Sequence, residues 1–348
     1  MVGKWLVAPA VCLALLSAVA PQEGHAQTTA KTLNVLSYGG SIDDSIRKAL
    51  ADFEKRNDVT IHWVPGSSTE RAAKMIGTKA NPEYDVGLLD TSVYDTASKA
   101  GVLAKFDPSI MTNLSDARPE AKVAANDSVA IGFYIPGFFY NDGEFRKRGW
   151  EPPKSWNDLF KPEFCNHIGL MDATISYTLS HLIILAGGDL NKMPEAIDKF
   201  ATLKNCVRTL EPSAPKLEEK IQLGEYLVGV HGSVRVIPLS LNGYPIKFVT
   251  PSDGVFLWAS TCSAAAGGKQ EKLAQQLCNE LISPAAQKIL MENSFFLPVN
   301  RNVDVPPKLI ELGLPPVSVL STAIKPDGPT IAEHRREWNR KLDRAMAR

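Results

Sequence analysis

The sequence has no surplus of charge of either sign, and this excludes several broad classes of function. Its 348 residues include 38 Lys and Arg against 38 Asp and Glu, so the formal net charge is zero. General binders of nucleic acid or of membrane surfaces need a basic surplus, which this chain lacks. Hydrophobic residues make up 44% and charged residues 22% of the chain, as in a globular protein with a buried core. The length suits one to three domains, and we expect two lobes.

The sequence also lacks the short motifs that identify several classes of enzyme. It contains no G-x-S-x-G, no H-E-x-x-H and no Walker loop. Ser45 and Lys48 match the S-x-x-K pattern of penicillin-recognising enzymes, but no K-T-G or S-D-N follows, so we interpret the match as chance. Asp90 and Asp172 are candidates for paired carboxylates, which leaves an exported hydrolase as an alternative function. Otherwise we predict no catalytic residue, no cofactor and no metal site.

Long apolar runs are absent apart from one near the amino terminus. Leu6–Ala20 follows Lys4 and has the length of a signal-peptide core, which is short for a membrane span. Gly24–Ala26 provides small residues at both key cleavage positions. We therefore predict that residues 1–26 are a signal peptide cut after Ala26, and that the mature protein is exported and soluble.

Cysteine is scarce, but export makes disulfides possible. Four cysteines follow the predicted signal peptide: Cys165, Cys206, Cys262 and Cys278. They allow three pairings, and we favour Cys165–Cys206 with Cys262–Cys278 because each pair then stays within one segment of the chain. Four free, buried thiols remain the alternative. No C-x-x-C occurs and no histidine lies beside them at ligand spacing, which argues against a metal site.

The strongest local signal is a strand, a glycine turn and a helix within Leu33–Phe53. Apolar residues from Leu33 to Val35 predict a buried strand, and Tyr38–Ser41 is the turn. Apolar residues then recur at spacings of three and four, as on one face of a helix. Ser41 is the expected N-cap, and acidic residues follow in the first turn, where the helix dipole favours them. Such a turn leaves backbone N–H groups free beyond the end of the strand.

The same alternation recurs twice more along the chain. Val59–Val64 predicts a strand before a helix over Thr69–Lys79 with Ser68 or Thr69 as its cap. Val86–Leu89 predicts a third strand, and a helix follows to about residue 100. Successive strand–helix units indicate a parallel sheet whose strand-to-helix turns share one edge. A second alternating region follows, and Ile131–Asn141 and Val255–Ala266 suit segments that cross between two lobes.

With these features the chain resembles the periplasmic solute-binding proteins of ABC importers, and in particular the subgroup that contains spermidine/putrescine-binding proteins. The resemblance covers roughly Leu33–Arg301. Its most specific piece is Ser-Trp-x-Asp-Leu-x-x-Pro-Glu at residues 155–163. YDVGLLDTSVY at Tyr84–Tyr94, PSDGVFLW at Pro251–Trp258 and SPAAQKILMENSFFLPVNR at Ser283–Arg301 support it.

The resemblance implies an α/β fold of the type II-like binding-protein kind, with two lobes that are each a mixed sheet flanked by helices. Hinge strands would join the lobes, which close on a small ligand. Lobe 1 would comprise residues 27–135 and 260–310, and lobe 2 residues 136–259. The C-terminal segment 311–348 ends in a helix and is not assigned to a lobe. The expected partners of this periplasmic monomer are a solute and an inner-membrane ABC permease, not nucleic acid; a receptor-presenting role would share the fold.

The resemblance also implies which residues face the ligand, and most of them lie at strand ends. The expected set is Ser37, Tyr38, Gly39, Ser68, Thr69, Asp90, Thr91, Phe133, Asp172, His231, Ser233, Arg235, Trp258 and Ser260.

Two departures from the polyamine-binding pattern bear on the charge of the ligand. The family pattern places one acid two positions after the Trp of the crossing strand, where this chain has Ser260, and another three positions after Asp172, where it has Ile175. A desolvated ammonium without a carboxylate partner costs several kcal/mol. We therefore expect weak polyamine binding, although a polyamine-binding protein remains the main alternative.

Arg235 points to the opposite ligand charge. It falls in the first turn of a predicted helix at the edge of the cleft, and a guanidinium there suits a carboxylate or phosphonate. A surface ion pair is the alternative role for this side chain. A zwitterionic ligand would place its amine on Asp90 or Asp172.

Overall fold

The computed structural model describes residues 1–3, 31–171, 176–324 and 327–347. The chain divides into a short unit, residues 1–30, and a compact unit, residues 31–348, which holds all the helices and strands given below. Most of the predicted signal peptide lies outside the described residues. No helix in the described part of the chain has both the length and the apolar character of a membrane span.

The first of two five-stranded sheets has the order β2-β1-β3-β10-β4. Its strands are β1 (Lys31–Ser37), β2 (Val59–Pro65), β3 (Val86–Asp90), β4 (Val129–Tyr134) and β10 (Trp258–Ala264). β1 is parallel to β2 and β3, as the repeated strand–helix units predict, and β10 is antiparallel to both its neighbours. The sheet is therefore mixed because a strand from late in the sequence inserts between β3 and β4.

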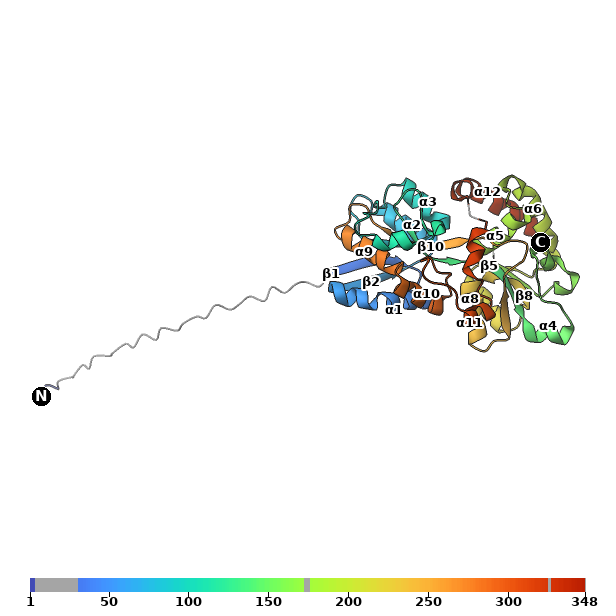
Figure 1. The fold of residues 1–348 in the computed structure, drawn as a ribbon, viewed down its shortest axis with the longest axis horizontal. Helices are drawn as coiled ribbons and strands as arrows, with labels where there is room; N and C mark the ends of the chain where they lie inside the picture. Colours follow the sequence, from blue (N-terminus) through green and yellow to red (C-terminus); the bar gives the residue numbers. More distant parts are fainter. Residues whose placement is uncertain (4–30, 172–175, 325–326, 348) are drawn as a thin grey trace. The chain divides into compact units, whose positions relative to one another are not determined.

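The second sheet has the order β7-β6-β8-β5-β9. Its strands are β5 (Pro136–Asn141), β6 (Ile168–Met171), β7 (Leu210–Glu211), β8 (Val228–Gly232) and β9 (Ile246–Val249). β6 is parallel to β7 and β8, and β5 is antiparallel to β8 and β9. Two mixed sheets flanked by helices confirm the predicted two-lobe α/β fold (Figure 1).

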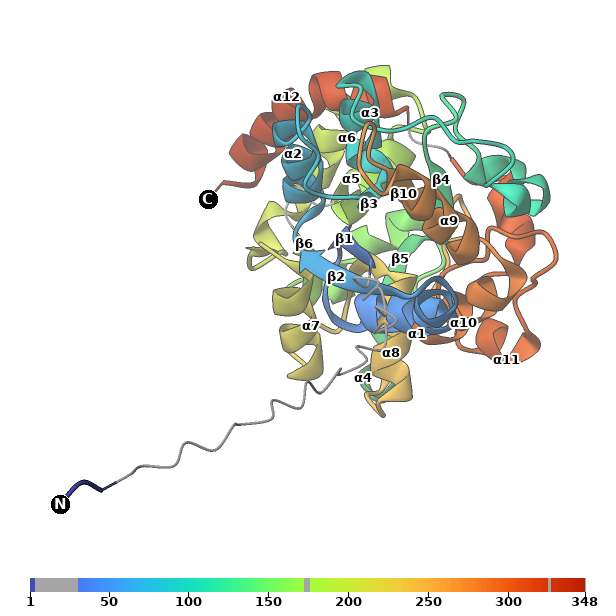
Figure 2. The same cartoon turned by 90° about the vertical axis from the view of Figure 1, so that its left-hand side faces the viewer.

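Helices cover both faces of each sheet. Around the first sheet, α1 and α10 lie on one side and α2 and α3 on the other; around the second, α5 and α6 lie opposite α8 (Figures 1 and 2). The α-helices are α1 (Gly40–Asn57), α2 (Ser68–Gly77), α3 (Thr91–Lys99), α4 (Asp142–Arg148), α5 (Ser176–Leu185), α6 (Met193–Phe200), α7 (Ala214–Gln222), α8 (Ser233–Leu241), α9 (Glu271–Leu281), α10 (Pro284–Ser294), α11 (Pro307–Glu311) and α12 (Gly328–Met346). Short 3-10 helices occupy Thr112–Asp116, Pro119–Ala121, Trp156–Phe160, Pro162–Phe164, Leu190–Lys192, Ala201–Asn205 and Val317–Ser321.

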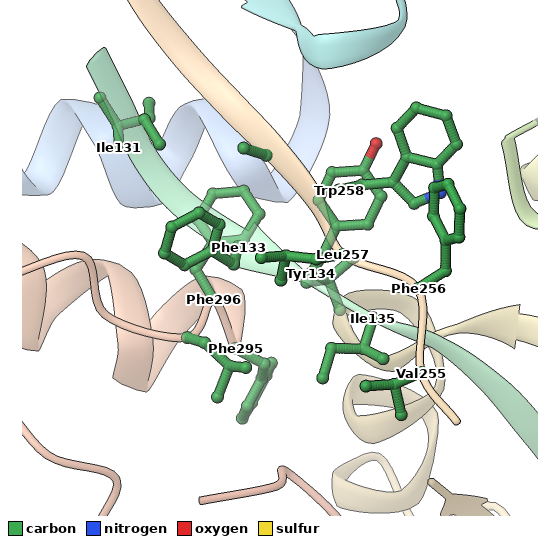
Figure 3. Packing of buried hydrophobic residues seen from close by; sticks show 14 of the residues in the cluster. Ile131, Phe133, Tyr134, Ile135, Val255, Phe256, Leu257, Trp258, Phe295 and Phe296 are labelled. Atoms are coloured by element: carbon green, nitrogen blue, oxygen red, sulfur yellow. The ribbon is translucent and has the colours of Figure 1, made fainter. Parts of the chain in front are cut away.

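The chain passes between the sheets at Ile135 and again between β9 and β10. Ile131–Asn141, expected as one crossing strand, is two strands separated by Ile135. On the return, Trp258 and Ala259 already pair with β4 of the first sheet. The sequence assigned both residues to lobe 2, whereas β10 begins at Trp258, within the segment Val255–Ala266 expected as the return crossing. Figure 3 shows the two crossing segments side by side, with apolar side chains between them.

The C-terminal helix α12 contacts helices that flank each of the two sheets. It packs against α3 of lobe 1 and against α6 of lobe 2. Lys341 Nζ donates to Pro194 O at 2.8 Å and pairs with Asp198 at 3.0 Å, while Trp338 and Leu342 are buried. The sequence interpreted the charges of this helix as a solvated face, but the buried residues give it a core-facing side as well.

Both predicted disulfides are present. Cys165 pairs with Cys206 across a Cα–Cα distance of 4.3 Å, and Cys262 pairs with Cys278 across 5.5 Å. The second bond joins β10 to α9 inside the core of lobe 1, where both cysteines are buried. Each bond shortens the free chain of the unfolded state and so favours folding.

Candidate functional site

Strand ends of both lobes meet at the first crossing. Trp258 of β10 lies opposite Tyr134 of β4, the residue before Ile135. On the other side of the crossing, Ser233 N donates to Ile135 O at 3.0 Å. The start of α8 in lobe 2 is therefore hydrogen-bonded to the residue that follows Tyr134, next to the aromatic pair of lobe 1.

Asp90 and Ser260 extend this cluster into lobe 1. They lie opposite each other where β3 and β10 pair, and Ser260 is two residues from Trp258. Asp90 also begins α3, but it makes no capping bond because its carboxylate is engaged elsewhere. Thr91, the next residue, accepts a hydrogen bond from Ala259 N at 3.1 Å and so ties α3 to the crossing strand. The registers thus bring these predicted site residues to one edge of the sheet.

The turn after β1 is held by a buried carboxylate. Asp43 accepts hydrogen bonds from Ser37 Oγ at 2.6 Å and from Tyr38 N at 3.0 Å. Gly39 is the N-cap of α1 with a φ of +78°, so the helix begins at Gly40. The expected cap, Ser41, is wrong: it is already the second helical residue, because Gly39 adopts the left-handed backbone that the turn requires.

Tyr38 presents its ring and hydroxyl at the same edge. Its hydroxyl donates to Leu89 O at 3.2 Å. Burial, reinforced by the nearby charge of Asp90, raises the pKa of Tyr38 well above its ordinary range, so the phenol stays neutral. Tyr38 therefore offers the site an aromatic face and no charge.

Arg71 is the residue that sequence reasoning missed. Its side chain is 3% exposed and comes from α2. Nε donates to Leu88 O at 2.6 Å, and Nη1 donates to Gly66 O at 2.6 Å and more weakly to Ser37 O at 3.4 Å. One guanidinium thus joins the carboxyl ends of β1, β2 and β3. A signal was available, because Arg71 lies four positions before the buried Met75, on the apolar face of its helix.

The same guanidinium neutralises Asp90. Arg71 Nη2 donates to Asp90 Oδ2 at 3.1 Å, and the Asp90 side chain is 17% exposed. The guanidinium carbon also lies 4.2 Å from the centre of the Tyr38 ring, a cation–π contact. Asp90 is therefore half of an ion pair rather than a free carboxylate.

The start of α2 differs from the prediction in its cap. Ser67, not Ser68 or Thr69, is the N-cap: its hydroxyl accepts from Glu70 N, and the Glu70 carboxylate accepts from Ser67 N. This reciprocal pair is a capping box. Ser68 is half-buried, and its hydroxyl has no hydrogen-bond partner among the described residues. Thr69 is exposed.

Lobe 2 contributes a second cluster of charge. His231 is buried, and its Nε2 lies 3.3 Å from Glu218 Oε1. Arg235 Nη1 lies 3.8 Å from the same oxygen, so Arg235 takes part in the ion pair that the sequence left as an alternative. Burial, opposed by Glu218, lowers the pKa of His231, which keeps the ring neutral at pH 7. Glu218 comes from α7, a helix that the sequence did not predict.

Ser233 is the first residue of α8 and is fully buried. Its Oγ has no hydrogen-bond partner in the described part of the chain. Gly232 is the N-cap and has no side chain with which to cap the helix. The next N–H groups of α8 have no partner within the helix, as at any helix start.

Trp258 and Phe133 face different surroundings. Trp258 is buried, and its Nε1 donates to Ser180 Oγ of α5 at 2.6 Å, a contact from lobe 1 to lobe 2. Figure 3 shows Tyr134 beside Trp258, whereas Phe133 packs beside Phe296. Phe133 is thus surrounded by the core of lobe 1, and Tyr134 is the β4 residue next to the site. Successive strand residues point to opposite faces of a sheet, so the β4 residue beside Trp258 is Tyr134, one position after the predicted Phe133.

Asp172, a predicted site residue, lies outside the described residues, and so does Ile175, where the polyamine-binding pattern has an acid. Within the described ranges, no group of three or more His, Cys, Asp or Glu side chains is arranged to hold a metal ion.

Comparison with known proteins decides the family. Residues 48–313 match the family of bacterial extracellular solute-binding proteins. This chain belongs to that family. It is 23% identical over 308 residues to a spermidine/putrescine-binding periplasmic protein of Salmonella typhimurium, a match that covers 86% of this chain and 84% of the relative. The predicted resemblance is thereby confirmed.

Solved structures agree with the fold of this solute-binding protein. An ABC transporter structure from Clostridium perfringens has a TM-score of 0.75 at 24% identity and covers 90% of this chain and 99% of its own. The periplasmic binding protein AfuA of Actinobacillus pleuropneumoniae, with fructose-6-phosphate bound, has a TM-score of 0.69 at 21% identity, with 91% and 98% covered. The named ligands differ in charge, so the fold alone does not define what this solute-binding protein holds.

Proposed function

We propose that this solute-binding protein captures a small polar solute with an anionic group, a carboxylate or phosphonate, between its lobes in the periplasm. It then delivers the solute to the permease of an ABC importer. Closure of the two lobes at Ile135 and at the return crossing would bury the solute and exclude water.

The observation that carries this proposal is the start of α8. Ser233 is fully buried, its hydroxyl has no partner among the residues that the structure describes, and Gly232 leaves the helix start without a side-chain cap. Buried polar groups are normally hydrogen-bonded, so an unpartnered hydroxyl at this place suits a ligand acceptor. A helix start also favours negative charge. Arg235, two residues on, is partly exposed and adds a cation to the same turn.

The carboxylates of the site favour the same conclusion. A polyamine needs carboxylates free to pair with its ammonium groups. Asp90 is paired with Arg71, and Glu218 lies between His231 and Arg235. Ser260 stands at the position where the polyamine-binding pattern has an acid. The curated relatives are named for spermidine and putrescine, which is what favours a polyamine as the second candidate ligand.

Isothermal titration tests the proposal. The mature protein is titrated with dicarboxylates, amino acids and phosphonates, and in parallel with putrescine and spermidine. We expect measurable binding of at least one anionic or zwitterionic compound and weak binding of both polyamines. Tight spermidine or putrescine binding without any anion binding would overturn the proposal.

A matched pair of serine variants locates the anion. Ser233→Ala removes the unpartnered hydroxyl and is expected to weaken anion binding about tenfold to a hundredfold, because a hydrogen bond to a charged group contributes about 1.5–3 kcal/mol. Ser263→Ala is the control, since Ser263 is equally buried but bonds to Ser128. Equal affinities of the two variants would contradict the role of Ser233.

An exported hydrolase is the less favoured function. Family membership points to a binding protein, and the ion pair of Asp90 with Arg71 removes one candidate acid. The compounds that bind in the titration are incubated with the protein and assayed for products. Stoichiometric binding without turnover is the expected result, and catalytic turnover would show that the site acts on its ligand.

A further inference from the structure

The buried guanidinium of Arg71 has a fixed position. Its donors contact backbone carbonyls of Leu88, Gly66 and Ser37 as well as the carboxylate of Asp90. Tyr38 covers one face of it. Arginine stays charged at any pH that a protein survives, so this is a permanent positive charge at the site edge of lobe 1.

The negative groups nearby are already satisfied. Asp90 pairs with Arg71, and Asp43 is buried with its two oxygens engaged by Ser37 Oγ and Tyr38 N. An ammonium group that approached Asp90 would share the carboxylate with the guanidinium and would be repelled by it. A carboxylate at the same place would meet a pair whose charges cancel, so it would escape the repulsion that an unpaired Asp90 would exert on it.

We propose that Arg71 is the specificity-determining residue of lobe 1, because its buried charge cancels Asp90 and makes this half of the site reject diamines. This inference rests on the proposed function because it assumes that the ligand binds between the lobes, at the site that Arg71 borders. Arg71 acts through Asp90 and the three strand ends, and so it is a positioning residue as well as a source of charge.

Lobe 2 has a similar pair, but it is looser. Arg235 and Glu218 are 3.8 Å apart, and the Arg235 side chain is 35% exposed. Within the described ranges, Arg235 donates to no backbone carbonyl, in contrast to Arg71. Water screens an exposed pair, so a ligand can displace one partner of it more easily than it can displace Arg71. This contrast assigns the positive charge with the fixed position to lobe 1.

The test compares putrescine and succinate affinities across four variants. Arg71→Met leaves Asp90 unpaired and is expected to raise the ratio of putrescine to succinate affinity at least tenfold. Arg71→Lys keeps the charge and should return the ratio close to that of the wild type. Adding Asp90→Asn to Arg71→Met should abolish the gain in putrescine binding, and Asp90→Asn alone should shift the ratio toward succinate.

Arg118→Met is the control for loss of a positive charge. Arg118 also belongs to lobe 1 and donates to Val303 O and Asp304, outside the site. Its substitution should leave the affinity ratio unchanged. Circular dichroism and thermal melting verify that each variant is folded.

The outcomes separate this inference from the proposed function. An unchanged ratio in folded Arg71→Met, or putrescine binding to none of the folded variants, overturns the role of Arg71. If Arg71→Met does not fold, Asp90→Asn decides alone, and an unchanged ratio there has the same meaning. Tight wild-type binding of polyamines without any anion binding overturns the proposed function, while a tenfold rise in the putrescine to succinate ratio of Arg71→Met still supports the inference about Arg71.

Discussion

His181 should make lobe 2 less stable in mild acid. The side chain lies on α5 with no exposed surface, and the rings of Trp156 and Phe200 are 4.8 and 5.4 Å from its own. Burial lowers the pKa of His181 to about 3. An unfolded chain binds a proton at this residue below about pH 6.5, whereas the folded chain does not until about pH 3.

The sign and size of the effect follow from this difference. His181 favours the folded state fully above pH 6.5, and the contribution is lost as the pH falls toward 3. Each pH unit within this window costs about 1.4 kcal/mol, so moving from pH 6.5 to pH 5 costs about 2 kcal/mol. His231 has a lowered pKa for the same reason and adds a slope of the same sign.

Urea unfolding at pH 7 and pH 5 measures the effect, with tryptophan fluorescence as the probe because Trp156 touches His181. Replacing His181 with Phe keeps an aromatic ring in the cluster and removes the titrating group. We expect this variant to lose about 2 kcal/mol less stability than the wild type between the two pH values. His62→Gln is the control, because His62 is an exposed histidine of β2. Equal losses in the wild type and in His181→Phe would refute the reasoning.

Two further predictions concern packing and cross-linking in the same molecule. A Cβ at Gly229 would lie 1.9 Å from the backbone oxygen of Gly169 on the neighbouring strand, so Gly229→Ala should push β8 away from β6 and lower the free energy of unfolding by about 1–3 kcal/mol, whereas Gly77→Ala meets open space and serves as the thermal-melting control. Replacing Cys262 and Cys278 with Ala should cost about 3 kcal/mol, because the disulfide closes a loop with a separation of 16 residues. Unchanged melting of either variant would contradict these contacts.

Apolar periodicity was sufficient to predict most of the fold. The apolar residues of Val59–Val64 and Val86–Leu89 predicted two strands, and β2 and β3 begin at these positions and end one residue later than predicted. β2 begins with alternating buried and exposed residues, as a strand with one covered face does. α7 was not predicted, because Ala214–Gln222 buries only Leu217 and Ile221 and offers a weak pattern.

Local exceptions explain most errors at the site. The cap of α1 moved from Ser41 to Gly39 because only a glycine takes the backbone angle of that turn without strain. Phe133 and Tyr134 are both aromatic, and nothing in their order says which one faces the core. Composition gives no sign that strand β10 will place Trp258 opposite Tyr134.

The charge of the ligand is harder to predict because it depends on pairs between distant residues. Arg71 and Asp90 are 19 positions apart, and Glu218 and Arg235 belong to different helices. A count of acids at family positions treats Asp90 as a free carboxylate, whereas the structure shows it neutralised. Relatives of one fold are named for polyamines and for a sugar phosphate, so membership cannot decide between them. The decision falls to the few side chains that pair with each carboxylate, and Arg71 is the one whose contacts fix it in place.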